Sequence, residues 1–174
     1  METLVHVNGE TGRKQFRLFL LMLMLIVTVL FFPYQDMLVV RDDRTQKLVW
    51  QDTLKGNKRF SIRWIHSIHG TPIEEYYAAK GDQLLLEQVS FKDYGIGVDS
   101  GLQANEKLVM KNGTFFIENM NRKYPAIHLF IGQVRANHTL LYEGRSIPFG
   151  SIAKPGTPVS IQVERRSLIQ MMGG

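Results

Sequence analysis

The sequence contains no cysteine among its 174 residues. This absence excludes disulfide-stapled scaffolds, thiolate zinc sites, lipid anchors attached through cysteine, and cysteine nucleophiles. Proline is scarce, with six residues, and the fifteen glycines form no internal repeat. Collagen-like chains and proline-rich low-complexity chains are therefore excluded as well.

The remaining composition is that of one folded domain with an additional N-terminal segment. Hydrophobic residues make up 44% of the chain and charged residues 21%, too apolar a balance for a disordered chain. The formal net charge is +5, but after the N-terminal segment Lys and Arg are spread along the strands, at most two in a row, rather than clustered on one element. Nucleic acids bind clustered basic residues, so we expect no nucleic-acid partner.

The N-terminal segment contains the longest apolar run in the sequence. Residues 18–32 include one polar residue, Thr28. Residues 16–34 as a helix would span about 28 Å, close to a bilayer core of about 30 Å. The run predicts a transmembrane anchor at 16–34. A cleaved signal peptide is the alternative, although no small residue of a cleavage site follows the run.

The charged residues on either side of this run predict its orientation. Arg13, Lys14 and Arg17 precede it, whereas Gln35 and Asp36 follow it. The positive-inside rule then places residues 1–15 in the cytoplasm and residues 35–174 outside the cell membrane, extracellular or periplasmic, as one domain. We expect a single-pass membrane protein.

After the anchor, the hydrophobic pattern changes to a period of two, which is typical of half-buried strands. Turn signals at Gly81, Asn112-Gly113 and Gly144 separate several of these segments. No later segment has a long helical stripe, although residues 99–106 could form a short turn. The sequence predicts an antiparallel β-sandwich or partly closed barrel, with strands at 38–41, 47–51, 59–65, 73–79, 84–89, 107–110, 114–119, 127–131, 139–142 and 159–164.

The polar cluster at residues 66–75 follows one of these strands. His66, His69 and a carboxylate could in principle hold a metal ion. However, Glu74 and Glu75 should lie on opposite faces of their strand and cannot both bind one ion. The pattern favours a buried hydrogen-bond network in which His66 pairs with Glu74 or Glu75.

The other segments give no sign of catalysis. No Gly-x-Ser-x-Gly elbow is present, and His66 and Ser67 should point to opposite faces of a strand. Gly95 and Gly97 lie two residues apart, which is more typical of a sharp strand exit than of a phosphate-binding loop. We expect no enzyme activity, no catalytic residue, no metal and no cofactor.

These residues also support a family resemblance. The string FSIRWIHSIHGTPIEEYY, followed by FKDYGIGVDSG, resembles the family called domain of unknown function 1850. Arg122, residues 127–132 and His138 match its second half, and Asp99 stands where the family pattern has proline. The resemblance covers residues 58–163. It implies partner- or ligand-binding candidates at His66, Ser67, Thr71, Pro72, Glu74, Tyr94, Gly95, Gly97 and Arg122.

The resemblance implies a transport function. Members of this family are commonly encoded beside TRAP-type transporters of the TAXI class, which are ion-driven solute importers. We expect a membrane-anchored accessory subunit that binds the permease or its solute-binding protein. The alternatives are an extracytoplasmic module that binds a small anion or solute through Arg63, His66 and Arg122, and a metal-assisted hydrolase that uses His66 and His69.

Overall fold

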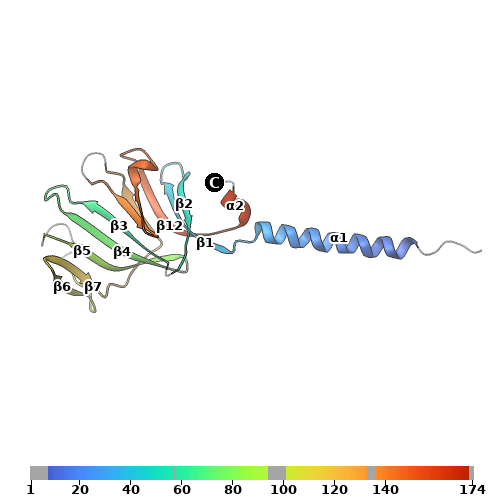
Figure 1. Cartoon of the computed structure of the whole chain (residues 1–174), viewed down its shortest axis with the longest axis horizontal. Coiled ribbons are helices and arrows are strands. Elements are labelled where there is room, and N and C mark those ends of the chain that lie inside the picture. The colour runs from blue at the N-terminus through green and yellow to red at the C-terminus, as the bar shows by residue number, and fades with distance from the viewer. Residues whose placement is uncertain (1–7, 57, 94–100, 133–135, 173–174) are drawn as a thin grey trace, which may run out of the picture. The chain divides into compact units, whose positions relative to one another are not determined.

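The computed structural model describes residues 8–56, 58–93, 101–132 and 136–172. The chain forms two compact units (Figure 1). One unit contains residues 1–35 and 165–174, and the other contains residues 36–164.

The first unit contains a long apolar helix, α1 (Asn8–Phe31). Within it, Gly12–Phe31 is long and apolar enough to cross a membrane, and none of this segment is buried by other parts of the chain. A signal sequence near the N-terminus would have the same length and composition. The helix ends before Pro33, which disfavours helical geometry at the residue that precedes it. A second, short helix of this unit, α2 (Leu168–Met172), contacts α1.

The second unit contains two β-sheets that are built mainly from antiparallel strands, as predicted. The smaller sheet has the order β2 (Leu48–Thr53), β1 (Gln35–Asp42), β12 (Pro158–Arg166) and β9 (Ala126–Phe130). The larger sheet has the order β11 (Arg145–Pro148), β10 (Thr139–Tyr142), β3 (Arg59–Ile65), β4 (Pro72–Lys80), β5 (Gln83–Phe91), β7 (Thr114–Glu118) and β6 (Lys107–Lys111), and β8 (Arg122–Tyr124) pairs with β5.

All ten predicted strands are confirmed, and the structure adds β8 and β11. Every strand pair whose register is described is antiparallel. The predicted turns are confirmed as well, since Asn112 and Gly113 both have positive φ angles, of 50° and 74°. Two consecutive positive φ angles match the twist of a tight hairpin. Residues 101–106 form a loop with one turn, whereas residues 99 and 100 lie outside the described part.

The hydrophobic core lies between the two sheets of this unit. The sheets face each other in Figure 1, and the strands of both contribute to one cluster of buried side chains. Leu38 and Val40 come from β1, whereas Phe60 and Ile62 come from β3. Because successive side chains of a strand point to opposite faces, the apolar alternation in the sequence places these residues inside. All members of the cluster belong to residues 36–164.

A buried tyrosine ties the larger sheet to the connection that follows β2. The Tyr142 hydroxyl on β10 donates to the carbonyl oxygen of Thr53 over 2.6 Å and accepts from the amide of Lys55 over 2.9 Å. The side chain is fully enclosed, and burial raises the pKa of Tyr142. The hydroxyl satisfies two backbone groups at the point where the chain passes from one sheet to the other.

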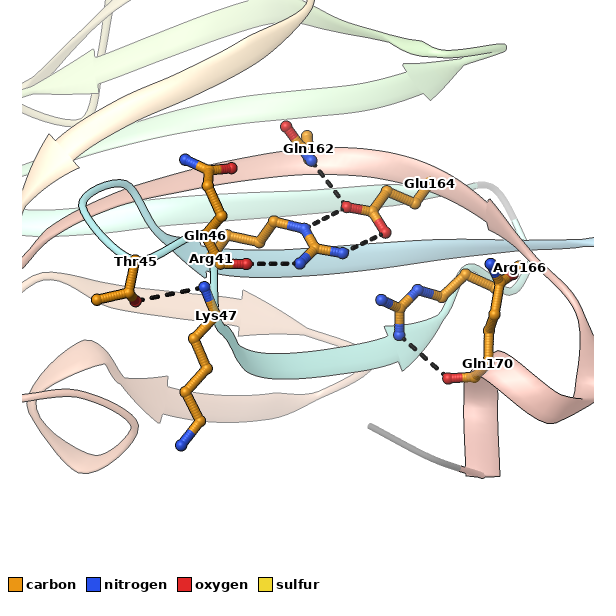
Figure 2. Close-up of polar contacts among 8 residues, drawn as sticks. All are labelled: Arg41, Thr45, Gln46, Lys47, Gln162, Glu164, Arg166 and Gln170. Atoms are coloured by element: carbon orange, nitrogen blue, oxygen red, sulfur yellow. Dashed lines mark hydrogen bonds and ion pairs between the residues drawn. The ribbon is translucent and has the colours of Figure 1, made fainter.

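A second tie joins β1 to β12 within the smaller sheet (Figure 2). Arg41 donates from Nε and Nη2 to the two carboxylate oxygens of Glu164, over 2.6 and 2.9 Å. Gln162 donates to the same carboxylate over 2.8 Å. A bidentate guanidinium–carboxylate pair is stronger than a single hydrogen bond, so this contact fixes the two strands in register.

Candidate functional site

The described part of the second unit contains a pocket of about 200 Å³ between its two sheets. Ile62 and Trp64 of β3 and Glu75 of β4 come from the larger sheet. Residues 127–129 of β9 come from the smaller sheet, and His138 immediately precedes β10. The pocket therefore combines apolar walls with one carboxylate and two imidazoles.

Glu75 lies in this pocket because of its register. It pairs with Ile62 across the β3–β4 ladder and alternates with Ile73 and Tyr77, both of which are buried. The Tyr77 hydroxyl donates to Glu75 Oε2 over 2.6 Å. Burial raises the pKa of the Glu75 carboxyl, and burial together with the neighbouring carboxylate raises the pKa of Tyr77. The Glu75 carboxyl is therefore partly buried and accepts one hydrogen bond, from the Tyr77 hydroxyl.

His138 also lines the pocket, next to Trp64. Its ring lies 6.0 Å from that of Trp64, measured between ring centroids. The Nδ1 atom of His138 is buried and has no hydrogen-bond partner among the described residues. Burial lowers the pKa of His138, which favours the neutral imidazole. A neutral ring that carries its proton on Nε2 presents Nδ1 as an acceptor.

His128 also belongs to the pocket lining, although 66% of its side chain is exposed. Its Nδ1 lies 2.8 Å from a carboxylate oxygen of Asp43. Across the described residues, no group of three histidine, aspartate or glutamate side chains could hold a metal ion. The described lining of the pocket offers a carboxylate, an imidazole and an aromatic side chain.

The predicted network between His66 and the glutamates is wrong. His66 Nδ1 lies within 3.3–3.4 Å of the backbone amides of Ile68 and His69, where it caps the turn at residues 66–70. The His66 amide donates to the carbonyl oxygen of Thr71 over 2.8 Å. The ring is used inside the turn because this turn leaves backbone amides that need an acceptor.

Glu74 and Glu75 lie on opposite faces of β4, as their spacing indicates. Glu74 accepts from Ser61 Oγ over 2.6 Å and from Arg63 Nε over 2.8 Å. These three residues form a cross-strand cluster on the face of β3 and β4 that points away from the pocket. The two neighbouring glutamates therefore have separate roles, one in a surface ion pair and one in the pocket.

Arg122 at the start of β8 forms a buried ion pair. It donates from Nε and Nη2 to the two carboxylate oxygens of Glu106, each over 2.8 Å. The side chains of Arg122 and Glu106 are only 13% and 2% exposed. The amide of Gln103 also donates to Glu106, and the Arg122 hydrogen bonds hold the pKa of Glu106 below its usual value. This pair fixes the loop that precedes β6.

The sequence-predicted site residues thus separate into several places. Ser67 and Thr71 lie in the turn after β3, and Pro72 begins β4. Tyr94, Gly95 and Gly97 lie outside the described residues. Arg63, His66 and Arg122, the residues considered for anion binding, are engaged at three different places: Arg63 with Glu74, His66 with the amides of its own turn, and Arg122 with Glu106.

None of the described lining residues is among the sequence-predicted binding candidates. Glu75 was considered only as a partner of His66, and His138 only as a position that matches the family. The sequence contains a signal for Glu75, because the alternation of side chains along its strand places this acidic residue on the face that points toward the core. Trp64 alternates with Phe60 and Ile62 and was interpreted only as strand packing. His138 gave no local signal, because its position depends on the pairing of distant segments.

The buried Glu75 predicts a pH effect on stability. The folded-state pKa is raised above the ordinary 4.5, so its stabilising contribution is fully present below that value and lost as the pH rises through the folded-state pKa. We expect Glu75→Gln to remove this loss and to stabilise the protein near pH 7 by about 1 kcal/mol. Denaturant unfolding of both proteins at several pH values measures the difference.

The comparison of the two proteins isolates Glu75, because both contain Tyr77, which bonds to residue 75, and the two lining histidines His128 and His138. His138 acts in the opposite sense, since its lowered pKa makes stability fall as the pH falls below its ordinary 6.5. Because His138 is present in both proteins, its contribution cancels in the difference between their free energies of unfolding. Parallel pH profiles for parent and variant would show that Glu75 keeps an ordinary pKa in the folded protein.

One comparison with known proteins gives a match. The family model described as Domain of unknown function (DUF1850) matches residues 60–149, which is half of the chain. All residues that line the pocket lie within this span. No curated protein and no solved structure matches the chain.

Proposed function

We propose, from the fact that this chain belongs to the DUF1850 family, that it is a membrane-anchored accessory subunit of a TRAP-type solute uptake transporter of the TAXI class. The proposed link to transport is based on the family resemblance. The proposed membrane anchoring is based on one observation, the apolar helix α1. Restricting two partners to one membrane raises their effective concentration without any new contact. A small anchored domain suits such a subunit.

The side chains of α1 support anchoring. Most of its large apolar side chains are exposed, and no residue of the membrane-span candidate Gly12–Phe31 is buried. The polar Thr28 donates its hydroxyl to the carbonyl oxygen of Met24 over 2.8 Å. A hydroxyl that is satisfied inside its own helix is compatible with hydrocarbon surroundings. The surface of α1 therefore suits lipid or the helices of a permease.

The charges that flank α1 support the proposed orientation. Arg13, Lys14 and Arg17 lie at its N-terminal end, which by the positive-inside rule remains in the cytoplasm. The β unit at residues 36–164 then lies on the outer side of the cell membrane, where it can reach the permease and the solute-binding protein.

The turn after β3 is the proposed contact surface on this β unit. Ile68 at the tip of the turn is 78% exposed. His66 holds the turn from within, and Glu74 lies on the strand that follows it. An exposed apolar residue on a turn that its own hydrogen bonds hold in place can serve as an anchor in a partner's pocket.

Purification of the full-length protein from native membranes in mild detergent tests this proposal. We expect a large multi-span permease to be recovered at a ratio near one to one, as mass spectrometry would show. Ile68→Asp should reduce the recovery, whereas Met110→Asp should not, although Met110 on β6 is 67% exposed. Recovery of the protein alone, from membranes that contain the permease, would contradict the accessory role.

A second candidate function is an extracytoplasmic solute-binding module that acts on its own. The pocket lined by Trp64, Glu75 and His138 favours it, because small-ligand sites combine apolar walls with a few convergent polar groups. Recovery of the protein alone together with saturable binding of a small solute would favour this candidate over the accessory subunit.

A further inference from the structure

The polar groups of the pocket are incompletely paired. Glu75 accepts one hydrogen bond, from the Tyr77 hydroxyl, and no lysine or arginine among the described residues forms a salt bridge with it. The Nδ1 atom of His138 is buried without a partner in the same described part. Buried polar groups are usually satisfied, so two incompletely satisfied acceptors in one pocket indicate a place for a donor.

We infer that this pocket binds a small organic cation, namely a primary ammonium attached to a compact apolar group. The ammonium carries three donors and no acceptor, which matches the carboxylate of Glu75 and the Nδ1 lone pair of His138. Trp64 offers an aromatic face, to which cations are attracted. Ile62, Ile127 and Leu129 provide apolar walls for the remainder of the ligand.

The charge balance of the lining favours a cation over an anion. Among the described lining residues, the two histidines are the groups that can carry a positive charge. Burial favours the neutral form of His138, and His128 lies beside Asp43. An anion would meet the Glu75 carboxylate, and the described lining offers it no guanidinium or ammonium in compensation. A bound ammonium would instead stabilise the charged form of Glu75.

The size of the pocket limits the ligand. A volume of about 200 Å³ corresponds to roughly seven water molecules at the liquid density. A single aromatic ring or a short aliphatic chain with one amino group fits this limit. The pocket has no described group that would pair with a carboxylate on the ligand, so a simple amine suits it better than an amino acid.

Binding of benzylamine to the purified full-length protein in mild detergent tests this inference. The chain has two tryptophans, so a Trp50→Phe background leaves Trp64 as the fluorescent reporter in the pocket. We expect saturable binding of benzylamine, and binding at least about tenfold weaker for the uncharged benzyl alcohol and the anionic benzoate. Equal binding of all three, preferred binding of benzoate, or no saturable binding of benzylamine would overturn the inference.

Substitutions locate the site. Glu75→Gln keeps the shape of the side chain and an acceptor for Tyr77 but removes the charge, and should weaken benzylamine binding about tenfold or more. Glu118→Gln on β7 is the control, because Glu118 pairs with Lys111 at an exposed position, and should bind like the parent. Leu129→Phe should abolish binding by filling the pocket.

The inference is independent of the accessory role, because the permease is absent from this experiment. If the protein binds benzylamine but recovers no permease, the pocket ligand stands and the accessory role is rejected. If it recovers the permease but does not bind benzylamine, only the pocket ligand is rejected. Thermal unfolding of each variant shows whether it is folded. A folded Glu75→Gln or Leu129→Phe variant with the parental benzylamine affinity would contradict the inference.

Discussion

Replacing Arg122 by methionine should lower the free energy of unfolding by about 3 kcal/mol, because it leaves Glu106 buried without its partner. The Glu106 side chain is 2% exposed and accepts two hydrogen bonds from the guanidinium. Methionine retains much of the volume of the arginine stem, so most of the loss should come from the unpaired carboxylate rather than from a cavity. Urea unfolding of both proteins measures the change.

A second substitution identifies the cause of this loss. Glu106→Gln in the Arg122→Met background removes the unpaired charge and should restore part of the stability, since the penalty arises from a buried unpaired ion. Lys111→Met is the matched control, because the Lys111–Glu118 pair is largely exposed and should contribute about 0.5 kcal/mol or less. Equal losses for Arg122→Met and Lys111→Met would contradict the buried pair.

The same ion pair predicts the direction of the acid response. The Arg122 hydrogen bonds lower the folded-state pKa of Glu106 from the ordinary 4.5. The contribution of the pair is therefore present above that value and lost as the pH falls through the folded-state pKa. In the Arg122→Met variant, the decrease in stability at low pH that comes from this ion pair should disappear, while the contributions of other carboxylates remain.

The strands could be predicted because their signals are local. Apolar alternation in β3 and the Asn112-Gly113 turn depend on a few consecutive residues, and neither requires knowledge of the partner strand. β8 and β11 were not predicted because they are short and, unlike the four-residue β10, contain no two apolar residues in alternation. Arg122–Tyr124 has no apolar alternation of its own. The pairing of β8 with residues 84–86 of β5 makes it a strand.

The predicted helix boundary shows a related limit. Residues 16–34 were predicted as the anchor from hydrophobicity, whereas α1 begins at Asn8 and ends at Phe31. Hydrophobicity measures the length of the apolar run, while the helix continues through polar residues until a breaker stops it. Pro33 stops it at the C-terminal end.

The pocket could be predicted only in part. The β3–β4 hairpin is local, so the inward position of Glu75 beside Ile62 follows from alternation and register. The other wall comes from β9, which belongs to the smaller sheet and pairs with β12. That long-range placement has no signal in the sequence of residues 127–129. The motif positions instead drew attention to Glu74, whose carboxylate faces away from the pocket.

Replacing Leu23 and Val27 by arginine should release the protein from the membrane. Residues 18–32 contain twelve Leu, Ile, Phe and Val residues, which together favour insertion by about 4–7 kcal/mol on a translocon scale. Two arginines near the centre of the helix cost about 5–7 kcal/mol and also remove two of the favourable residues. The substituted helix should no longer insert. Membrane fractionation at high pH, followed by detection of the protein, measures the shift.

The matched control is Leu23→Ala with Val27→Ala, which removes the same apolar side chains without adding charge and should leave the protein in the membrane. Intact-mass measurement of the membrane-extracted parent separates an anchor from a signal sequence, because an uncleaved anchor retains residues 1–34. The core of the β unit lies wholly within residues 36–164, so this unit has no structural need for α1 to fold. A β unit that remained in the membrane with two arginines in α1 would show that another surface holds it there, and the anchoring step of the proposed function would then fail.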